Sequence, residues 1–271
     1  LNQTETRTGR ISSTEPNLQN IPVRSSLWRE MRKFFVARDG YVLVDEDYSQ
    51  IELRVLAHIS GDQNMIKAFN DNTDIHTVTA SEVFDMPPQL VTPIMRSRAK
   101  AVNFGIVYGI GAFSLAKDIG VSRSEADEYI KGYLRHYSGV DKYMHDVVEK
   151  AKKDGYAETM FARRRYLPEL TASNANTRAF GERVARNMPI QGTAADIIKI
   201  AMIRVYERLE RENLAAKLIM QVHDELIVEA PENEKERVSA LLKEEMENAV
   251  KLSVALTADV HSGRTWYDAK G

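Results

Sequence analysis

Residues 41–54 read YVLVDEDYSQIELR, and this stretch decides the fold that the sequence predicts. It starts with a short apolar run of β-prone residues, 41–44, which predicts a strand. Three acids follow, and over 49–59 the apolar residues recur at close to helical spacing, which predicts a helix. The sequence therefore places carboxylates where a strand gives way to a helix.

The regions before and after this stretch differ in pattern. Residues 1–38 are polar, contain two prolines and predict a loop with short extended pieces. Residues 62–158 predict several short helices, with Asp74 and Ser122 as N-caps. Short polar side chains suit these positions because they accept hydrogen bonds from the free N–H groups of a first helical turn.

The last third of the chain predicts a long helix and a hairpin. Pro189 is expected to open a helix that runs to about Glu212, since a proline in the first turn forfeits no helical hydrogen bond. Two β-prone runs, 217–221 and 226–229, flank a short turn, and 232–251 predict an amphipathic helix. This order of elements predicts an α+β fold in which a helical insertion interrupts a sheet.

The composition is that of an ordinary soluble globular protein. The 271 residues are 43% hydrophobic and 28% charged, and no apolar run approaches the roughly 20 residues of a membrane-spanning helix. With no cysteine, the chain has neither disulfides nor thiolate metal ligands, which fits a reducing compartment. Because it starts at Leu1 rather than at a methionine, we expect a fragment of a longer protein.

Charge is unevenly distributed along the chain. The net charge is only −2, yet residues 163–211 carry ten Lys or Arg and five Asp or Glu, whereas 224–251 carry nine acids and four bases. A protein that grips phosphates needs a local basic groove, and total charge is a poor guide to one. Helices that solvate their outer faces would give the same pattern, so the charges permit nucleic-acid binding without requiring it.

Two cations and two aromatic residues form a regular series in the middle of the chain. Arg96, Lys100, Phe104 and Tyr108 are spaced by four residues, so on a helix they form one slowly turning stripe roughly 18 Å long. Cations facing phosphates and rings facing a base would suit a nucleoside triphosphate, with on the order of 4 kcal/mol of gross attraction per close cation. Aromatic residues on helices more often belong to the core, and spacing alone leaves both interpretations open.

Two acids lie at the ends of predicted strands. Asp47 follows the first strand, and Asp224 lies in the predicted hairpin turn. Two carboxylates brought together repel each other unless a cation lies between them, and magnesium held by few carboxylates and by substrate phosphates is the usual solution. Two such ions would stabilise the attacking and the leaving oxygen of an in-line displacement. Local hydrogen bonding is the commoner role of a lone Asp in such places, and this alternative stays open.

Three motifs stand in a fixed order along the chain. Residues 47–54 read DYSQIELR, the stripe ends in Tyr108-Gly109, and residues 221–225 read QVHDE. Together they resemble motifs A, B and C of family A DNA polymerases, the bacterial DNA polymerase I group. Two upstream stretches also match that family: TGRISS at 8–13 and PNLQNIP at 16–22. The resemblance covers essentially the whole chain and implies an antiparallel-sheet palm interrupted by mostly helical fingers.

The resemblance also implies which residues bind metal and nucleotide. Asp47 and Asp224 would hold two magnesium ions (Mg2+), with Glu225 beside them as a helper. Lys100 would be catalytic as well as substrate-binding. The other implied substrate contacts are the phosphate-binding Arg96 and His76, the stacking Phe104, Tyr108 at the templating-base pocket, and Gln50 and Glu52 of motif A. Glu52 would be the steric gate that excludes ribonucleotides.

Further matching positions imply contacts with primer–template DNA. Arg10 and Gln191 match residues that touch the minor-groove edge of the new base pair, with Arg183 and Asn187 nearby, and His223 would lie near the primer end. The minor groove presents acceptors in similar places on every correct pair, so a donor there tests pair shape and ignores sequence.

Motif A is preceded by two more acids, Asp45 and Glu46, whose role the sequence leaves open. Asp45 lies two residues from Asp47 and could point the same way in a strand. The register set by the following Tyr-Ser-Gln selects Asp47 as the motif residue.

We therefore expect the palm over 1–60 and 186–271 and the fingers over 61–185, with the family's thumb and exonuclease-like domain preceding Leu1. The expected activity is DNA-directed addition of deoxynucleotides to a primer 3′-hydroxyl with release of pyrophosphate, in replication and repair. The expected location is the bacterial cytoplasm, at the nucleoid, and the fragment alone should be weakly active. Two alternatives remain: a single-subunit RNA polymerase, which Glu52 disfavours, and a catalytically inert DNA-binding fragment.

Overall fold

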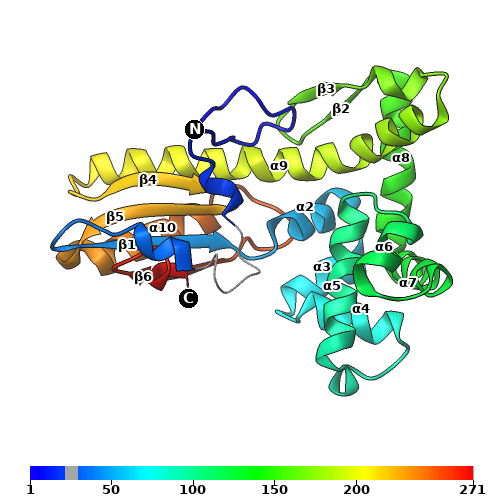
Figure 1. Cartoon of the computed structure of the whole chain (residues 1–271), viewed down its shortest axis with the longest axis horizontal. Coiled ribbons are helices and arrows are strands. Elements are labelled where there is room, and N and C mark those ends of the chain that lie inside the picture. Colours follow the sequence, from blue (N-terminus) through cyan, green and yellow to red (C-terminus); the bar gives the residue numbers. More distant parts are fainter. Residues whose placement is uncertain (22–29, 271) are drawn as a thin grey trace. The chain divides into compact units, whose positions relative to one another are not determined.

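The computed structural model describes residues 1–21 and 30–270, so residues 22–29 of the predicted N-terminal loop lie outside it. Its mixture of helices and an antiparallel sheet confirms the α+β class (Figure 1). The helices are α2 Ile51–Ser60, α3 Gln63–Asn70, α4 Ile75–Val83, α5 Pro93–Val107, α6 Ala112–Ile119, α7 Arg123–His136, α8 Ser138–Asp154, α9 Ala175–Arg211 and α10 Lys235–Glu247. The strands are β1 Tyr41–Tyr48, β2 Tyr156–Glu158, β3 Arg164–Tyr166, β4 Lys217–Val222, β5 Glu225–Pro231 and β6 Ala258–Gly263.

The chain divides into two compact units. The first contains residues 1–51, 194–251 and 256–271, and the second contains residues 52–193 and 252–255. The first unit holds the larger sheet, and the second holds helices α3 to α8 with the small β2–β3 sheet. The palm and fingers segments expected from the sequence stay a prediction.

The first unit is built on a four-stranded antiparallel sheet in the order β4-β5-β1-β6. The predicted hairpin is confirmed, with His223 at a φ of 51° in the turn between β4 and β5. Strand β1 is longer than predicted, because Asp45, Glu46 and Asp47 pair with both β5 and β6. Pairing on both sides overrides the low strand preference of these acids. The sequence did not predict β6.

Residues of β1 alternate between two faces of the sheet, as strand geometry requires. Helix α10 covers one face, where the Tyr48 hydroxyl donates to the Met246 carbonyl at 2.6 Å. On the other face Leu43 packs against Trp266 in a small core. The acids of β1 therefore divide: Glu46 shares the α10 face with Tyr48, and Asp45 and Asp47 share the opposite face with Leu43.

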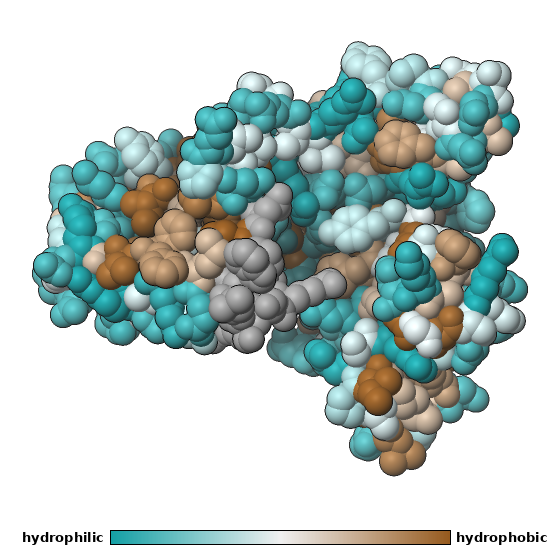
Figure 2. All heavy atoms as spheres, in the orientation of Figure 1, coloured by the Kyte–Doolittle hydropathy of each residue, from teal (hydrophilic) through white to brown (hydrophobic). Residues whose placement is uncertain are grey.

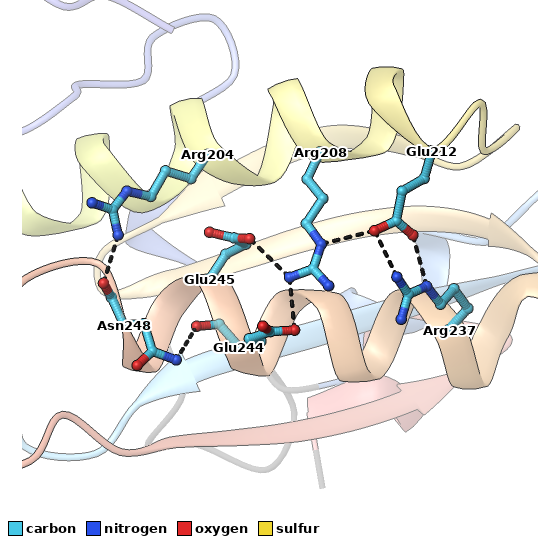
Figure 3. Close-up of polar contacts among 7 residues, drawn as sticks. All are labelled: Arg204, Arg208, Glu212, Arg237, Glu244, Glu245 and Asn248. Carbon is cyan, nitrogen blue, oxygen red and sulfur yellow. Dashed lines mark hydrogen bonds and ion pairs between the residues drawn. The ribbon is translucent and has the colours of Figure 1, made fainter.

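Ion pairs connect the second half of α9 to α10 (Figure 3). Arg208, whose side chain is only 10% exposed, bonds to Glu212 at 2.9 Å and to Glu244 and Glu245 at 2.8 Å each. Arg237 donates to both carboxylate oxygens of Glu212. Several acids share one poorly exposed guanidinium, so this network fixes the position of α10 along α9 better than isolated surface pairs would.

The prediction that Pro189 opens the long helix is wrong, because Pro189 lies inside α9. The helix begins earlier, after Asn174, whose side-chain oxygen accepts from the N–H of Asn176 at 2.8 Å and of Thr177 at 3.2 Å. An interior proline costs about 3 kcal/mol in a helix. The neighbouring Met188 is fully buried in a core with residues of α8 and of the following loop, and this packing offsets the cost.

The second unit confirms both predicted N-caps. Asp74 accepts from the His76 N–H, and Ser122 forms a reciprocal capping box with Glu125. The β2–β3 hairpin lacked a sequence signal because its strands have three residues each.

The described surface is mostly polar. Figure 2 shows hydrophilic side chains over most of the visible face, with hydrophobic ones in separate groups. None of the described helices combines the length and the apolar character needed to cross a membrane.

Candidate active site

The two acids that the sequence singled out lie on adjacent backbone positions of the first unit. Asp47 is opposite Glu225 in the β1–β5 pair, and the Tyr48 N–H donates to the Asp224 carbonyl at 3.1 Å. Both Asp47 and Asp224 are half-buried. The sheet thus joins motif A to motif C, which are far apart in the sequence.

A lysine ammonium lies among the carboxylates of this region. Lys270 Nζ donates to Asp47 Oδ2 at 2.9 Å and also to Glu225 Oε2. The second oxygen of Glu225 accepts from the Trp266 indole N–H at 3.2 Å. No motif pointed to Lys270, which only the folded C-terminal segment brings to β1. In this structure its ammonium is the cation that balances Asp47 and Glu225.

Asp45 lies on the same face but is 2% exposed. Burial and the neighbouring Glu225 carboxylate raise the pKa of Asp45 to about 7, although Lys270 acts in the opposite direction. The selection of Asp47 as the metal-binding acid of motif A stays a prediction.

A cavity of about 230 Å³ opens beside these acids. Its lining residues are Asp45, Asp47, Tyr48, Ser49, Asp259, His261 and Lys270. Apart from residues 22–29 and 271, which are not described, no three His, Cys, Asp or Glu side chains group as a metal site of their own. Magnesium is commonly held by one or two carboxylates together with waters and substrate phosphates. Asp47 and Asp224 would supply two carboxylates to an ion that binds together with a substrate, and the carboxylate of Asp47 is already paired with an ammonium.

Glu46 is buried on the α10 face of β1, and both its carboxylate oxygens lack a hydrogen-bond partner among the described residues. Burial and the Glu247 carboxylate raise the pKa of Glu46 from 4.5 to about 8, against the attraction of Lys243. The folded protein therefore keeps a proton that the unfolded chain releases, and stability falls as pH rises between these two values.

Glu46→Gln is expected to stabilise the protein by roughly 2–5 kcal/mol near pH 9 and to change little near pH 5, because glutamine fills the same space without a charge. Urea unfolding at both pH values measures the difference. Glu236→Gln, an exposed change on α10, is the matched control and should shift stability by less than about 0.5 kcal/mol at either pH. An equal gain for Glu46→Gln at both pH values would contradict the buried-proton explanation.

The stripe on α5 lies on the accessible side of that helix. Arg96 and Lys100 are exposed, Phe104 is half-buried, and Tyr108 is 46% exposed. The opposite side of α5 is buried, and its residues are Ala99, Val102, Asn103, Gly105, Ile106 and Val107. The stripe is therefore not part of the core of the second unit and is available to a ligand.

Arg96 already has an anionic partner. Its Nε donates to Asp74 Oδ2 at 2.5 Å, and Asp74 also accepts from the Thr77 hydroxyl at 2.9 Å. Burial raises the pKa of Asp74, but the hydrogen bonds from Arg96, Thr77 and the His76 N–H, with the charge of Arg96, together hold that pKa below its usual value. Asp74 thus caps α4 and holds the guanidinium of α5.

His76 is 2% exposed and follows Asp74 in α4. Burial, together with the charges of Arg96 and Lys100, lowers the pKa of His76 to about 4, against the pull of Asp74. His76 is therefore neutral near pH 7, and its Nδ1 lies 3.1 Å from Asn103 Nδ2. The predicted phosphate contact by His76 stays a prediction.

The remaining motif A residues lie where the strand passes into α2. Gln50 has a φ of 55° just before the helix, and Glu52 is 4% exposed in its first turn. A buried acid at this position is compatible with a steric role, which stays a prediction.

The residues predicted to bind DNA fall in both units. Arg10 and His223 line a cavity of about 300 Å³ in the first unit, and His223 Nε2 lies 2.7 Å from the Gln19 carbonyl. Arg183, Asn187 and Gln191 belong to the second unit.

The end of α5 packs closely on α9 within the second unit. Asn187 Nδ2 donates to the Val107 carbonyl at 3.3 Å, and a Cβ on Gly109 would lie 3.2 Å from Arg183 Cγ. Gly109 also has a φ of 65°, so glycine is required there for two reasons. Two groups of predicted site residues, from motif B and from α9, are thus brought together.

Comparisons with known proteins agree with these motifs. The family model described as DNA polymerase family A matches residues 1–268. DNA polymerase I of Geobacillus stearothermophilus is 54% identical over 271 residues, covering 100% of this chain and 31% of the relative. DNA polymerase I of Bacillus subtilis (strain 168) is 53% identical with the same coverage.

A solved structure shows the same likeness in three dimensions. The polymerase domain of Pol1 from M. smegmatis, in complex with DNA primer–template and dNTP, superposes with a TM-score of 0.96 at 47% identity. It covers 100% of this chain, which in turn covers 48% of that structure, and the chain spans about a third of the length of the curated relatives. Because the family model matches residues 1–268, the chain belongs to DNA polymerase family A.

Proposed function

We propose that this chain is the palm and fingers portion of a DNA-directed DNA polymerase that extends a primer 3′-hydroxyl by deoxynucleotides. The observation that carries the proposal is the backbone adjacency of Asp47, which lines a cavity, and Asp224, in a chain that matches family A along nearly its whole length. A role in replication and repair, and a place in the bacterial cytoplasm at the nucleoid, belong to the same proposal.

The proposed chemistry divides between the two units. Asp47 and Asp224 would hold two Mg2+ ions, which when bound stabilise charge on the attacking and leaving oxygens. Glu225, which Trp266 and Lys270 hold in place, would keep Asp47 and its neighbours oriented. Catalysis by the chain itself would consist mainly of positioning and charge stabilisation.

Side chains of the second unit would bind the nucleotide. Arg96 and Lys100 would contact phosphate oxygens, and a cation in such a place lowers the energy of charge that builds up as pyrophosphate leaves. Phe104 would stack on the sugar and base, Tyr108 would border the templating base, and His76 would donate an N–H to a phosphate. The exposure of Arg96, Lys100 and Tyr108 supports the assignments made to the stripe.

Primer–template DNA and deoxynucleoside triphosphates are the proposed partners. The M. smegmatis polymerase domain is described in complex with both. Arg10, Arg183, Asn187, Gln191 and His223 would contact the DNA through the minor-groove edge and the primer end.

The proposal is best tested in a chain of full length. Residues 1–271 would replace the matching third of the Geobacillus stearothermophilus polymerase, and template-directed primer extension would be measured with all four dNTPs. The chimera should extend primers, and the isolated chain should add nucleotides weakly and distributively at best. A chimera that binds DNA without extending it would leave the inert DNA-binding alternative. Faster incorporation of ribonucleotides than deoxynucleotides would instead favour an RNA polymerase.

Glu52→Ala is expected to weaken discrimination against ribonucleotides by about 10- to 100-fold, because removing the buried side chain opens space for a 2′-hydroxyl. The ratio of kcat/KM for dNTP and rNTP in the chimera measures this effect. Glu82→Ala, at an exposed position on α4, serves as control and should leave the ratio unchanged. An unaltered ratio for Glu52→Ala would remove the gate assignment.

A further inference from the structure

A chain of buried polar side chains leads to His76 in the second unit. The Tyr137 hydroxyl lies 3.3 Å from Thr79 Oγ1, Thr79 Oγ1 lies 3.2 Å from Asn103 Oδ1, and Asn103 Nδ2 lies 3.1 Å from His76 Nδ1. Tyr137, Thr79 and Asn103 are fully buried, and His76 is 2% exposed. Buried polar groups are costly unless they are hydrogen-bonded, so the direction of each hydrogen bond is constrained.

The direction of the chain follows from its two ends. An amide nitrogen can only donate, so Asn103 Nδ2 makes His76 Nδ1 an acceptor without a proton. At the other end, the Tyr137 hydroxyl has no other hydrogen-bond partner among residues 1–21 and 30–270, so it donates to Thr79. Thr79 can then donate to Asn103 Oδ1. Asn103 Nδ2 also donates to Thr79 Oγ1 at 3.1 Å, so the Thr79 hydroxyl contacts both ends of the Asn103 amide.

The consequence for His76 concerns its single proton. The lowered pKa keeps the ring neutral near pH 7, so only one ring nitrogen carries hydrogen. With Nδ1 occupied as an acceptor, that hydrogen lies on Nε2. No hydrogen bond joins Nε2 to another described residue, and the side chain as a whole is 2% exposed.

We propose that Asn103 is a positioning residue which, through Thr79 and Tyr137, fixes His76 as the Nε2–H tautomer and so makes it a donor to the triphosphate. Phosphate oxygens only accept hydrogen bonds at neutral pH, and the opposite tautomer would turn a lone pair toward them. Arg96 and Lys100 act electrostatically on the same ring, so an anion attracted by them would be near it. This inference rests on the proposed function, since it assumes that His76 meets a nucleotide phosphate.

The role explains why a polar residue occupies the buried side of α5. Asn103 is adjacent in sequence to Phe104 of the stripe, and the Phe104 ring centroid lies 5.9 Å from that of His76. One helix thus carries the binding stripe on its exposed side and controls the protonation pattern of His76 from its buried side.

The first test measures the tautomer directly in the 271-residue chain without nucleotide. Imidazole nitrogen-15 shifts, with His76 assigned by its loss in His76→Gln, should show the Nε2–H form in the wild type. Thr79→Ser keeps the hydroxyl and should keep this form, whereas Asn103→Asp should lose it. In Asn103→Asp the carboxylate can only accept, so Nδ1 should gain a proton. A wild-type Nδ1–H form, or a neutral Nε2–H form that persists in Asn103→Asp, would overturn the proposal.

The second test measures dNTP binding in the chimera with Geobacillus stearothermophilus polymerase. Asn103→Leu and Thr79→Val should each weaken dNTP binding by about 10- to 100-fold, with a smaller effect on kcat. Thr79→Ser keeps the hydroxyl and should bind dNTP about as tightly as the wild type. Unchanged dNTP affinity despite an altered tautomer would overturn the link to the triphosphate. If the wild-type chimera extends no primer at all, the proposed function fails, while the tautomer measurement still decides whether Asn103 sets the proton on His76.

Discussion

Asp224→Asn is expected to lower the single-turnover rate of nucleotide addition by about a thousandfold or more in the full-length chimera. Asparagine keeps the shape of the turn between β4 and β5 but removes the negative charge that would hold a divalent ion. Loss of a metal ligand removes several kcal/mol of charge stabilisation, and each 1.4 kcal/mol corresponds to about a factor of ten in rate. Rapid-quench measurement with saturating primer–template and dNTP isolates this step.

Affinity for DNA should change little in the same variant, because Asp224 is not a cation that neutralises phosphates. Glu232→Gln, an exposed change just beyond the far end of β5, is the control and should leave both the rate and DNA affinity unaltered. If Asp224→Asn extended primers at the wild-type rate, the assignment of motif C as the metal-binding acid would be wrong.

Lys100→Met is expected to reduce kcat/KM for dNTP addition by about 100- to 1,000-fold. The exposed ammonium lies in the middle of the α5 stripe, and removal of one preorganised donor from a site of developing charge has costs of this size. The loss should appear mainly in kcat, because the contact is expected to strengthen as pyrophosphate leaves. Lys117→Met, at an exposed position on α6, is the matched control and should have kcat and KM close to the wild type.

Comparison with Arg96→Ala separates binding from chemistry. Arg96 is already engaged by Asp74, so its loss should raise KM more than it lowers kcat. A Lys100→Met effect confined to KM would assign Lys100 to ground-state binding instead of catalysis.

Local sequence signals predicted the parts of the fold that depend on local chemistry. The caps at Asp74 and Ser122 follow from short polar side chains before helical turns, and the β4–β5 hairpin follows from two apolar runs around a turn. The face of α5 that carries the stripe also follows from a four-residue spacing. In each case the interacting residues are close in sequence.

Features that depend on packing between segments far apart in the chain could not be predicted from the sequence. Pro189 lies within α9 because buried neighbours offset the missing hydrogen bond, and a local rule for prolines contains no information about such neighbours. Lys270 reaches Asp47 only because the C-terminal segment folds across the sheet. Asn103 appears in sequence as an ordinary polar residue beside an aromatic one, and its role depends on contacts with α4 and with Tyr137.

The sequence selected Asp47 as the motif A residue and left the role of Asp45 and Glu46 open. Strand alternation separates Glu46 from Asp45 and Asp47, and Asp45 is more buried than Asp47. Asp45 pairs with Ile227 of β5 and His261 of β6, segments far away in sequence, which no local pattern predicts.

On the proposed function, a nucleotide would reach Arg96 by exchange of partners, because Asp74 already holds the guanidinium. The guanidinium would give up one anion as it gains another, so the bond that is broken would offset part of the attraction between ligand and protein. A ligand with few negative charges would compete poorly with the resident carboxylate, and one with a long polyphosphate tail would compete well. Asp74 would therefore favour triphosphates over mono- and diphosphates.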